Sequence, residues 1–174
     1  MSVIFKSLSQ NISIILCIVI ISALSGCSDK AAQQATIHKA VAMENGDECH
    51  LCGMLITRFD GPKGEVFRKE QGETVYKFCS TRDMFSYYLD PENTRNVSQM
   101  MVHDMSKMPW GSDSIDDKYL IDAKSAWYVT GSEKKGAMGK TLASFSLQSD
   151  AEAFAEEFGG KVLSFKDINQ DSLY

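Results

Sequence analysis

The sequence lacks the residue patterns that mark the commonest classes of enzyme and of nucleic-acid-binding protein. We find no Ser–His–Asp arrangement, no glycine loop that could cradle a phosphate, and no convincing pair of carboxylates for acid–base chemistry. Its 18 basic residues are outnumbered by 23 acidic ones, and an acidic surface argues against nucleic acid as the main partner. The sequence therefore does not indicate catalysis, and we do not expect an enzyme.

The sequence also lacks a hydrophobic run long enough to cross a membrane comfortably. The mostly apolar residues 14–24 are typical of a signal-peptide core, and Lys6 is the only charged residue before them. The run ends in Leu-Ser-Gly-Cys at residues 24–27, which resembles a bacterial lipobox. That resemblance implies cleavage before Cys27, a lipid on Cys27, and, because Ser28 follows, sorting to the outer membrane. The alternative is an ordinary secretory signal with an incidental cysteine.

Cysteine is scarce in the mature chain, and its count is odd. Cys17 leaves with the signal peptide and Cys27 carries the lipid, so that Cys49, Cys52 and Cys79 remain as thiols. A pure disulfide framework would leave one of the three unpaired in an oxidising compartment. A disulfide framework therefore does not account for all three cysteines.

The chain divides into a leader, a tether and a folded region. We expect residues 1–26 to be the signal peptide, and residues 27–46 to be the lipidated cysteine followed by a flexible tether, because small polar side chains dominate there. The remainder is long enough for one compact domain or two small subdomains. We place a first unit at residues 47–111 and a second at residues 112–174.

Both units show the same order of strand, strand, helix and strand. In the first unit, strands are predicted at 65–67 and 74–78, a helix from residue 80 or 81 to near 91, and a strand at 99–103. In the second, strands are predicted at 126–130 and 141–146, a helix over 149–158, and a strand at 162–165. The pattern predicts a duplicated ββαβ unit in the α+β class.

The second helix carries local start and stop signals. Ser149 and Glu152 have the spacing of a capping box, which places the start of the helix near Ser149. Gly159 and Gly160 follow the last apolar position of the helical pattern and are expected to end it.

Residues 47–54, DECHLCGM, place two thiols in a C-x-x-C motif. The spacing of Cys49 and Cys52 alone fits a short-loop disulfide, a zinc site, a redox couple or a site for a softer metal. A redox couple of the thioredoxin type needs its first cysteine at the start of a helix. Residues 54–57 are instead predicted to form a strand, so the redox interpretation loses most of its support.

Cys79 lies between a predicted strand and the start of a predicted helix. Unpaired amides and the helix dipole favour a thiolate at that place, and a thiolate binds metals. A free cysteine is also often a small buried hydrophobic residue, so both roles stay open. With His50 or His103, the three thiols could make a Cys₃His zinc site.

A zinc site does not explain the methionines. Met54 follows the C-x-x-C motif after a single glycine, and Met138 lies in the glycine loop GAMG between two predicted strands. His103, Met105 and Met108 form a further group, although a lone histidine at a strand end more often makes structural hydrogen bonds. Thiolate and thioether ligands together select Cu(I). Single methionines more often fill a core, and Met138 is the one that its loop favours as a ligand.

The ordered set of motifs resembles the NosL lipoproteins. The motifs are DECHLCGM at 47–54, GPKG at 61–64, KFCS at 77–80, VHDM at 102–105, the stretch 122–128, and GAMG at 136–139 leading into LASF at 142–145. The likeness spans nearly the whole mature chain and includes the lipobox. No single motif is specific, but the ordered set is.

The resemblance implies a periplasm-facing copper chaperone. Members of that family deliver Cu(I) for the copper–sulfur cluster of nitrous oxide reductase, in concert with a membrane ABC-type maturation complex. The family fold is a pair of ββαβ units similar to part of the organomercurial lyase. The implied copper ligands are a cysteine and a methionine, with histidine as the candidate for a third ligand.

Carried onto this chain, the implied ligands match five positions, with Cys79 as a possible secondary metal ligand or a structural thiol. The five are Cys52, Cys49, Met54, Met138 and His103. We expect Cys52 and Met138 to hold one Cu(I) at low coordination number, at the edge between the two units. The alternatives are a docking lipoprotein stabilised by zinc or a disulfide, and, with less support, a thiol oxidoreductase.

Overall fold

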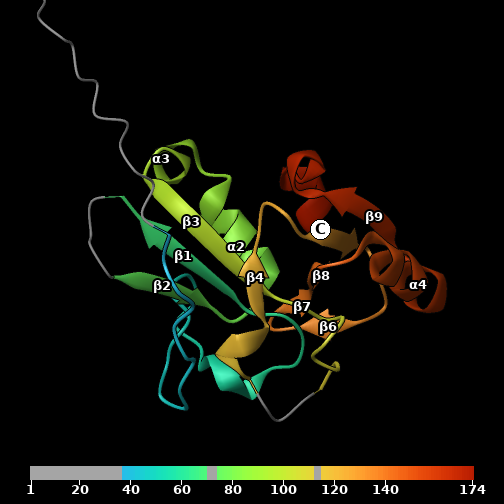
Figure 1. Cartoon of the computed structure of the whole chain (residues 1–174), viewed down its shortest axis with the longest axis horizontal. Coiled ribbons are helices and arrows are strands. Elements are labelled where there is room, and N and C mark those ends of the chain that lie inside the picture. Colours follow the sequence, from blue (N-terminus) through green and yellow to red (C-terminus); the bar gives the residue numbers. More distant parts are fainter. Residues whose placement is uncertain (1–36, 70–73, 112–114) are drawn as a thin grey trace, which may run out of the picture. The chain divides into compact units, whose positions relative to one another are not determined.

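The computed structural model describes residues 37–69, 74–111 and 115–174 (Figure 1). The predicted signal peptide and the lipobox with Cys27 lie outside the described residues. Within the described ranges, no helix has both the length and the apolar character needed to span a membrane.

The first sheet has four antiparallel strands in the order β2-β1-β3-β4. The strands are β1 (Gly64–Arg68), β2 (Val75–Phe78), β3 (Val97–His103) and β4 (Leu120–Asp122). Helix α2 (Thr81–Tyr88) follows β2, and its N-cap Ser80 accepts a hydrogen bond from the Asp83 amide at 3.1 Å. The short helix α3 (Pro91–Thr94) begins at a proline, a residue suited to a first helical turn.

The second sheet has three antiparallel strands in the order β8-β5-β9. The strands are β5 (Trp127–Thr130), β8 (Ala143–Phe145) and β9 (Lys161–Ser164), and α4 (Gln148–Phe158) connects the last two. Between β5 and β8, the two-stranded hairpin β6 (Lys135–Gly136) and β7 (Gly139–Lys140) presents the GAMG loop. The first strand of each ββαβ sequence is therefore central in its sheet, with the second and third strands beside it.

Short 3₁₀ helices complete the fold. They are η1 (Ile56–Arg58), η2 (Asp117–Tyr119), η3 (Phe165–Asp167) and η4 (Gln170–Leu173). The mixture of helices and antiparallel sheets confirms the α+β class. The boundary between residues 111 and 112 and the likeness to part of the organomercurial lyase stay predictions.

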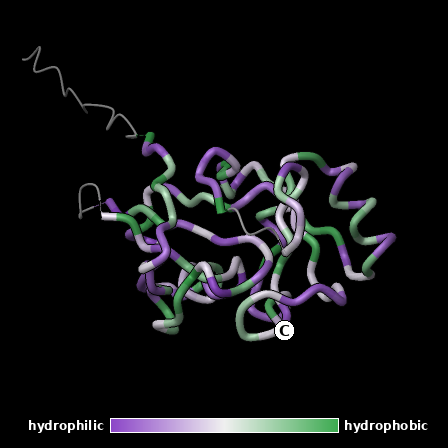
Figure 2. The backbone as a smooth tube through the Cα atoms, turned by 90° about the horizontal axis from the view of Figure 1, so that it is seen from below, coloured by the Kyte–Doolittle hydropathy of each residue, from purple (hydrophilic) through white to green (hydrophobic). Residues whose placement is uncertain are grey.

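Helix α2 contributes to the main hydrophobic core on both of its sides. It packs against β1 and β2 on one side and against η4 on the other. Its Phe85 ring meets the Tyr128 ring of β5 edge-on at 5.1 Å between centroids, and the Phe165 ring at 5.7 Å. Figure 2 shows hydrophobic and hydrophilic stretches interspersed along the backbone. The core therefore fixes α2 between the two sheets.

The segment before the C-x-x-C motif packs on the first sheet. The His38 amide donates to Gln99 Oε1 at 2.7 Å, and Gln99 Nε2 returns a bond to the His38 carbonyl at 3.1 Å. The Val41 amide donates to the Glu65 carboxylate at 3.2 Å, and Met43 is buried in the core. The flexible tether predicted for residues 27–46 therefore does not extend through residues 37–46, because the backbone of His38 and Val41 is hydrogen-bonded to β3 and β1 and Met43 is buried in the core.

Two local predictions are wrong. Residues 54–57 do not form a strand, because Leu55 makes a single bridge to Glu48 and the chain then enters η1. Ser149 does not cap α4, which begins one residue earlier at Gln148 after an N-cap without a side-chain hydrogen bond. Gln148 Nε2 instead donates to Glu152 Oε1 at 2.8 Å, a contact between side chains one helical turn apart. The helix does end at Gly159, which has φ of 73°.

The buried Glu65 makes the stability of the fold depend on pH. Burial raises the pKa of this carboxyl from 4.5 to about 7. The folded state thus holds the proton more tightly than the unfolded state, so the stabilising effect is complete below pH 4.5 and is lost as the pH rises through about 7. At about 1.4 kcal/mol per pKa unit, the free energy of unfolding should fall by up to about 3 kcal/mol across that window.

Urea unfolding at several pH values measures this slope. Glu65→Gln should flatten the slope between pH 4.5 and 8, whereas Glu156→Gln, at an exposed position on α4, should leave it unchanged. Equal slopes for wild type and Glu65→Gln would contradict the assignment.

Candidate metal centre

The C-x-x-C motif forms a tight turn held by its own backbone. The Cys49 amide donates to the Met54 carbonyl at 2.8 Å, and the Gly53 amide donates back to the Cys49 carbonyl at 2.8 Å. Gly53 has φ of 72°, which a residue with a side chain rarely adopts. The His50 amide donates to the Lys77 carbonyl at 2.8 Å and attaches the turn to β2. The turn is therefore fixed against the strand that leads to Cys79.

Three free thiols and one carboxylate meet at the start of α2. Cys52 Sγ lies 3.5 Å from Cys79 Sγ, and Asp83 Oδ2 lies 3.4 Å from Cys79 Sγ and 3.7 Å from Cys49 Sγ. All four ligand atoms lie within 4.8 Å of one another. Cys49, Cys79 and Asp83 are buried, and Cys52 is exposed. The cluster thus has an inner side and one thiol at the surface.

The thiols of the cluster differ in acidity because they share hydrogen bonds. The neighbouring Cys79 thiol stabilises the Cys49 thiolate and lowers the pKa of Cys49 to about 5. The same interaction with Cys49 raises the pKa of Cys79, and burial raises the pKa of Cys52. The first negative charge of the cluster therefore belongs to Cys49.

The spacing of the sulfur atoms suits a single metal ion. A metal–sulfur bond of roughly 2.3 Å places the sulfurs of a trigonal or tetrahedral site roughly 3.8 to 4.0 Å apart. The Sγ atoms of Cys52 and Cys79 are 3.5 Å apart, and no two ligand atoms of the cluster are more than 4.8 Å apart. The required separation lies between these two values. Thiolates are ligands for Cu(I) and Zn(II). The cluster can hold either ion with small movements of its side chains.

The GAMG loop is tied to the same end of α2. Met138 has φ of 60° and a side chain that is 62% exposed, so this loop displays its thioether. Arg82 Nη1 donates to the Met138 carbonyl at 3.1 Å, and Arg82 Nη2 lies 3.6 Å from Asp83 Oδ1. Arg82 therefore links the loop to the residue that contacts two of the thiols.

Met54, two residues after Cys52, is half-buried against the main core.

The contacts of His103 differ from those of the thiols. It is fully buried at the end of β3, where its Nδ1 accepts a hydrogen bond from the Lys63 amide at 3.2 Å. Burial lowers the pKa of His103 to about 4, so the ring is neutral. Among the residues that the structure describes, its ring is not part of the group that includes the thiols. Met105 and Met108 likewise contribute to packing.

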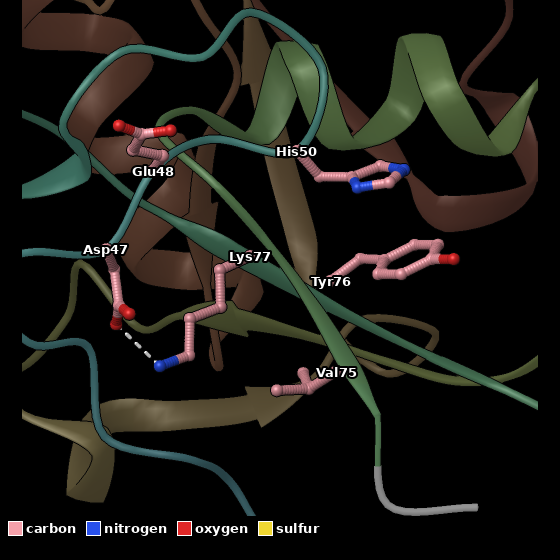
Figure 3. A pocket seen from close by; sticks show the side chains of 6 residues that line it. All are labelled: Asp47, Glu48, His50, Val75, Tyr76 and Lys77. Carbon is pink, nitrogen blue, oxygen red and sulfur yellow. Dashed lines mark hydrogen bonds and ion pairs between the residues drawn. The ribbon is translucent and has the colours of Figure 1, made fainter. Parts of the chain in front are cut away.

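His50 lines an open pocket on the surface of the first sheet, together with Tyr76 and Lys77 of β2 (Figure 3). The pocket has a volume of about 300 Å³, and the ion pair between Asp47 and Lys77 closes one side at 2.6 Å. The His50 ring stacks on Tyr76 with 3.7 Å between centroids. Within the described chain, His50 is also outside the thiol group. Its stacking contact accounts for its position.

Asp83 and Arg82 are site residues that we did not predict. Ser80 and Asp83 have the three-residue spacing of a helix N-terminus, and this spacing could have placed Asp83 beside the cysteine that precedes the helix. No comparable signal identifies Arg82, because its role depends on its hydrogen bond to Met138, which is 56 positions further along the chain.

Comparisons with known proteins identify the family of the chain. The family model NosL matches residues 40–173. A copper-binding lipoprotein NosL of Stutzerimonas stutzeri is 45% identical over 159 residues, covering 91% of this chain and 80% of the relative. A copper-binding lipoprotein NosL of Achromobacter cycloclastes is 32% identical over 146 residues, covering 83% and 74%.

A solved structure is similar as well. The crystal structure of the copper chaperone NosL from Shewanella denitrificans has a TM-score of 0.74 and 51% sequence identity, and the match covers 78% of this chain and 99% of that chain. Sequence, family model and structure therefore agree, and the chain belongs to the NosL family.

Proposed function

We propose that this chain is a metallochaperone that binds Cu(I) at the thiol cluster and delivers it for assembly of the copper–sulfur centre of nitrous oxide reductase. The observation that carries the proposal is the convergence of three free thiols at the start of α2, one of them exposed. The relatives named as copper-binding lipoproteins and the copper chaperone of similar structure support copper as the metal. The docking partner in this proposal is a membrane ABC-type maturation complex.

The proposed delivery step is an exchange of ligands without electron transfer. A soft ligand of the acceptor attaches to Cu(I) while a bond from Cys52 or Met138 breaks, and copper remains Cu(I) throughout. Both side chains are exposed, so an acceptor can approach them from solvent. Thiolate and thioether together favour Cu(I), and thioethers also survive an oxidising compartment because they cannot form disulfides. We further propose that a lipid on Cys27 anchors the chain facing the periplasm, at the outer membrane.

A structural zinc site is the second candidate. The Asp83 carboxylate lies with the three thiols and would complete a tetrahedral Cys₃Asp set. A closed site of that kind would hold zinc for stability and would not deliver it. The exposed Cys52 and the displayed Met138 favour copper delivery instead.

A metal competition experiment separates the two candidates. The reduced protein is titrated anaerobically with Cu(I) in the presence of a chromogenic Cu(I) chelator, and an excess of Zn(II) is then added. We expect one Cu(I) per chain that zinc does not displace. Stoichiometric zinc that survives a copper challenge would favour the structural site and overturn the proposal.

Replacing Met138 should slow copper transfer. Met138→Leu keeps the apolar bulk and removes the thioether, so the ligand that assists release is lost while the thiols remain. We expect transfer of Cu(I) to a competing chelator to slow about tenfold, equivalent to about 1.4 kcal/mol. Stopped-flow absorbance of the chelator complex measures the rate. Met105→Leu, in the packed second core cluster, is the matched control and should transfer at the wild-type rate.

A further inference from the structure

We propose that the outer edge of β2 binds an extended segment of a partner protein as an added strand, and that this segment carries an arginine or lysine opposite Glu48. The binding surface is the open pocket of Figure 3, whose walls are the chain at residues 47–50 and strand β2 at residues 75–77. None of the side chains that line this pocket belongs to the thiol cluster. The inference therefore goes beyond copper binding and does not depend on it.

The outward backbone groups of β2 are open at Val75. The sheet order β2-β1-β3-β4 makes β2 an edge strand, and its Tyr76 pairs with Val66 of β1. The His50 amide donates to the Lys77 carbonyl at 2.8 Å, on the side away from β1. Backbone groups alternate in direction along a strand, so Val75 faces outward as Lys77 does. Among the described residues, nothing pairs with the Val75 amide or carbonyl or with the Lys77 amide, and an added strand bonds to groups of this kind.

The pocket leaves space beside this edge for the side chains of an added strand. Its volume is about 300 Å³. Figure 3 shows the stacked rings of His50 and Tyr76 on one side and the ion pair between Asp47 and Lys77 on the other. Successive side chains of a strand point to opposite faces. One face of the added strand would therefore meet an aromatic surface, and the other would meet the ion pair.

The charge of the pocket favours a basic side chain. Asp47 and Lys77 neutralise each other, and burial lowers the pKa of His50, so its ring is neutral at pH 7. Glu48 is exposed, and within the described chain its carboxylate makes no hydrogen bond or ion pair. An arginine matches it best, because a guanidinium binds a carboxylate through two hydrogen bonds and also stacks on aromatic rings.

The same charge disfavours a second copy of the chain as the occupant. Two copies joined at this edge about a twofold axis would each present the same surface to the other. The unbalanced carboxylate of Glu48 would then face a pocket of like charge. A partner segment with a basic side chain balances that charge instead.

Amide hydrogen exchange of the metal-free protein, followed by NMR, tests whether the edge is open. The Val75 and Lys77 amides should exchange with solvent at least tenfold faster than the Tyr76 amide, which pairs with β1. The probe is a capped pentapeptide, TVRVT, whose alternating side chains favour a strand and whose centre is an arginine. At saturation it should slow exchange at Val75 and Lys77 at least tenfold and shift the signals of residues 47–50 and 75–77.

Two variants and a second peptide test the chemistry of the contact. Glu48→Gln should weaken TVRVT binding at least threefold, and the peptide TVEVT should bind the wild type at least tenfold more weakly than TVRVT. Val75→Pro removes the outward amide at the first residue of an edge strand, where proline is tolerated, and should weaken binding at least tenfold. Glu156→Gln on α4 is the matched control and should bind like the wild type. Thermal unfolding checks the fold of Val75→Pro, and the comparison of the two peptides needs no variant.

Three results would overturn the proposal. The first is equal affinity of the wild type for TVRVT and TVEVT. The second is a set of peptide-induced shifts that lies outside residues 47–50 and 75–77. The third is protection of the Val75 and Lys77 amides without peptide that grows with protein concentration, which would show that a second copy occupies the edge. None of these measurements involves copper, so their failure would leave the proposed function standing.

Discussion

Cys52→Ser should lower the affinity for Cu(I) by at least about 100-fold, the largest effect that we expect of any single substitution at the centre. Changes in the supporting shell of a metal site cost roughly 10- to 100-fold in affinity, and Cys52 is a proposed ligand rather than a supporting residue. It is also the exposed thiol of the cluster and lies 3.5 Å from Cys79. A hydroxyl is a harder, weaker ligand for Cu(I) than a thiolate, so the replacement removes the ligand while it keeps the shape.

Chelator competition under anaerobic, reducing conditions measures this loss. Leu51→Ser is the matched control because Leu51 is the preceding residue of the same turn and is 49% exposed, but offers no metal ligand. The control should bind Cu(I) like the wild type. Binding by Cys52→Ser within threefold of the wild type would show that this thiol does not hold the metal.

Phe85→Ala should lower the free energy of unfolding by about 3 to 5 kcal/mol, the range for truncating a buried phenylalanine. Phe85 is 1% exposed and lies on α2, where its ring meets Tyr128 and Phe165 from the second ββαβ unit. The truncation leaves a cavity where α2 contacts both sheets. Since α2 begins beside Cys79, copper binding should weaken together with the fold.

Urea denaturation of the metal-free protein measures the loss. Ile37→Ala removes a hydrophobic side chain that is 87% exposed and should change stability by less than about 0.5 kcal/mol. An effect of Phe85→Ala no larger than that of Ile37→Ala would show that α2 does not join the two parts of the core.

Much of the fold can be predicted because local signals agree with tertiary packing. The predicted strands fall within or next to β1, β2, β3, β5, β8 and β9, because short runs of apolar, β-branched and aromatic residues between polar turns favour strands. Ser80 caps the start of α2, and Gly159 ends α4. Both signals can be read from the sequence because they depend on local backbone geometry. Residues 54–57 are predicted incorrectly because short apolar stretches fit several conformations and the C-x-x-C turn fixes this one.

The candidate site could be predicted only in part, because its residues are distant in sequence. Cys52 and Cys79 are separated by 27 positions, and the hydrogen bond between His50 and the Lys77 carbonyl brings them together. No periodic pattern encodes that contact. The buried position of His103 could not be predicted either, because a histidine at a strand end has the same local sequence whether it binds a metal or a backbone amide.

The measurement that tests the central claim most directly is an amide NMR comparison of the metal-free and Cu(I)-loaded protein. If Cu(I) binds at the start of α2, the largest shifts should fall in residues 49–54, in residues 79–83 and in the GAMG loop at 136–139. These three segments are far apart in sequence and are joined by the thiol cluster and by Arg82. Shifts confined to the end of β3 around His103, or to the second sheet, would contradict a copper centre at the thiols.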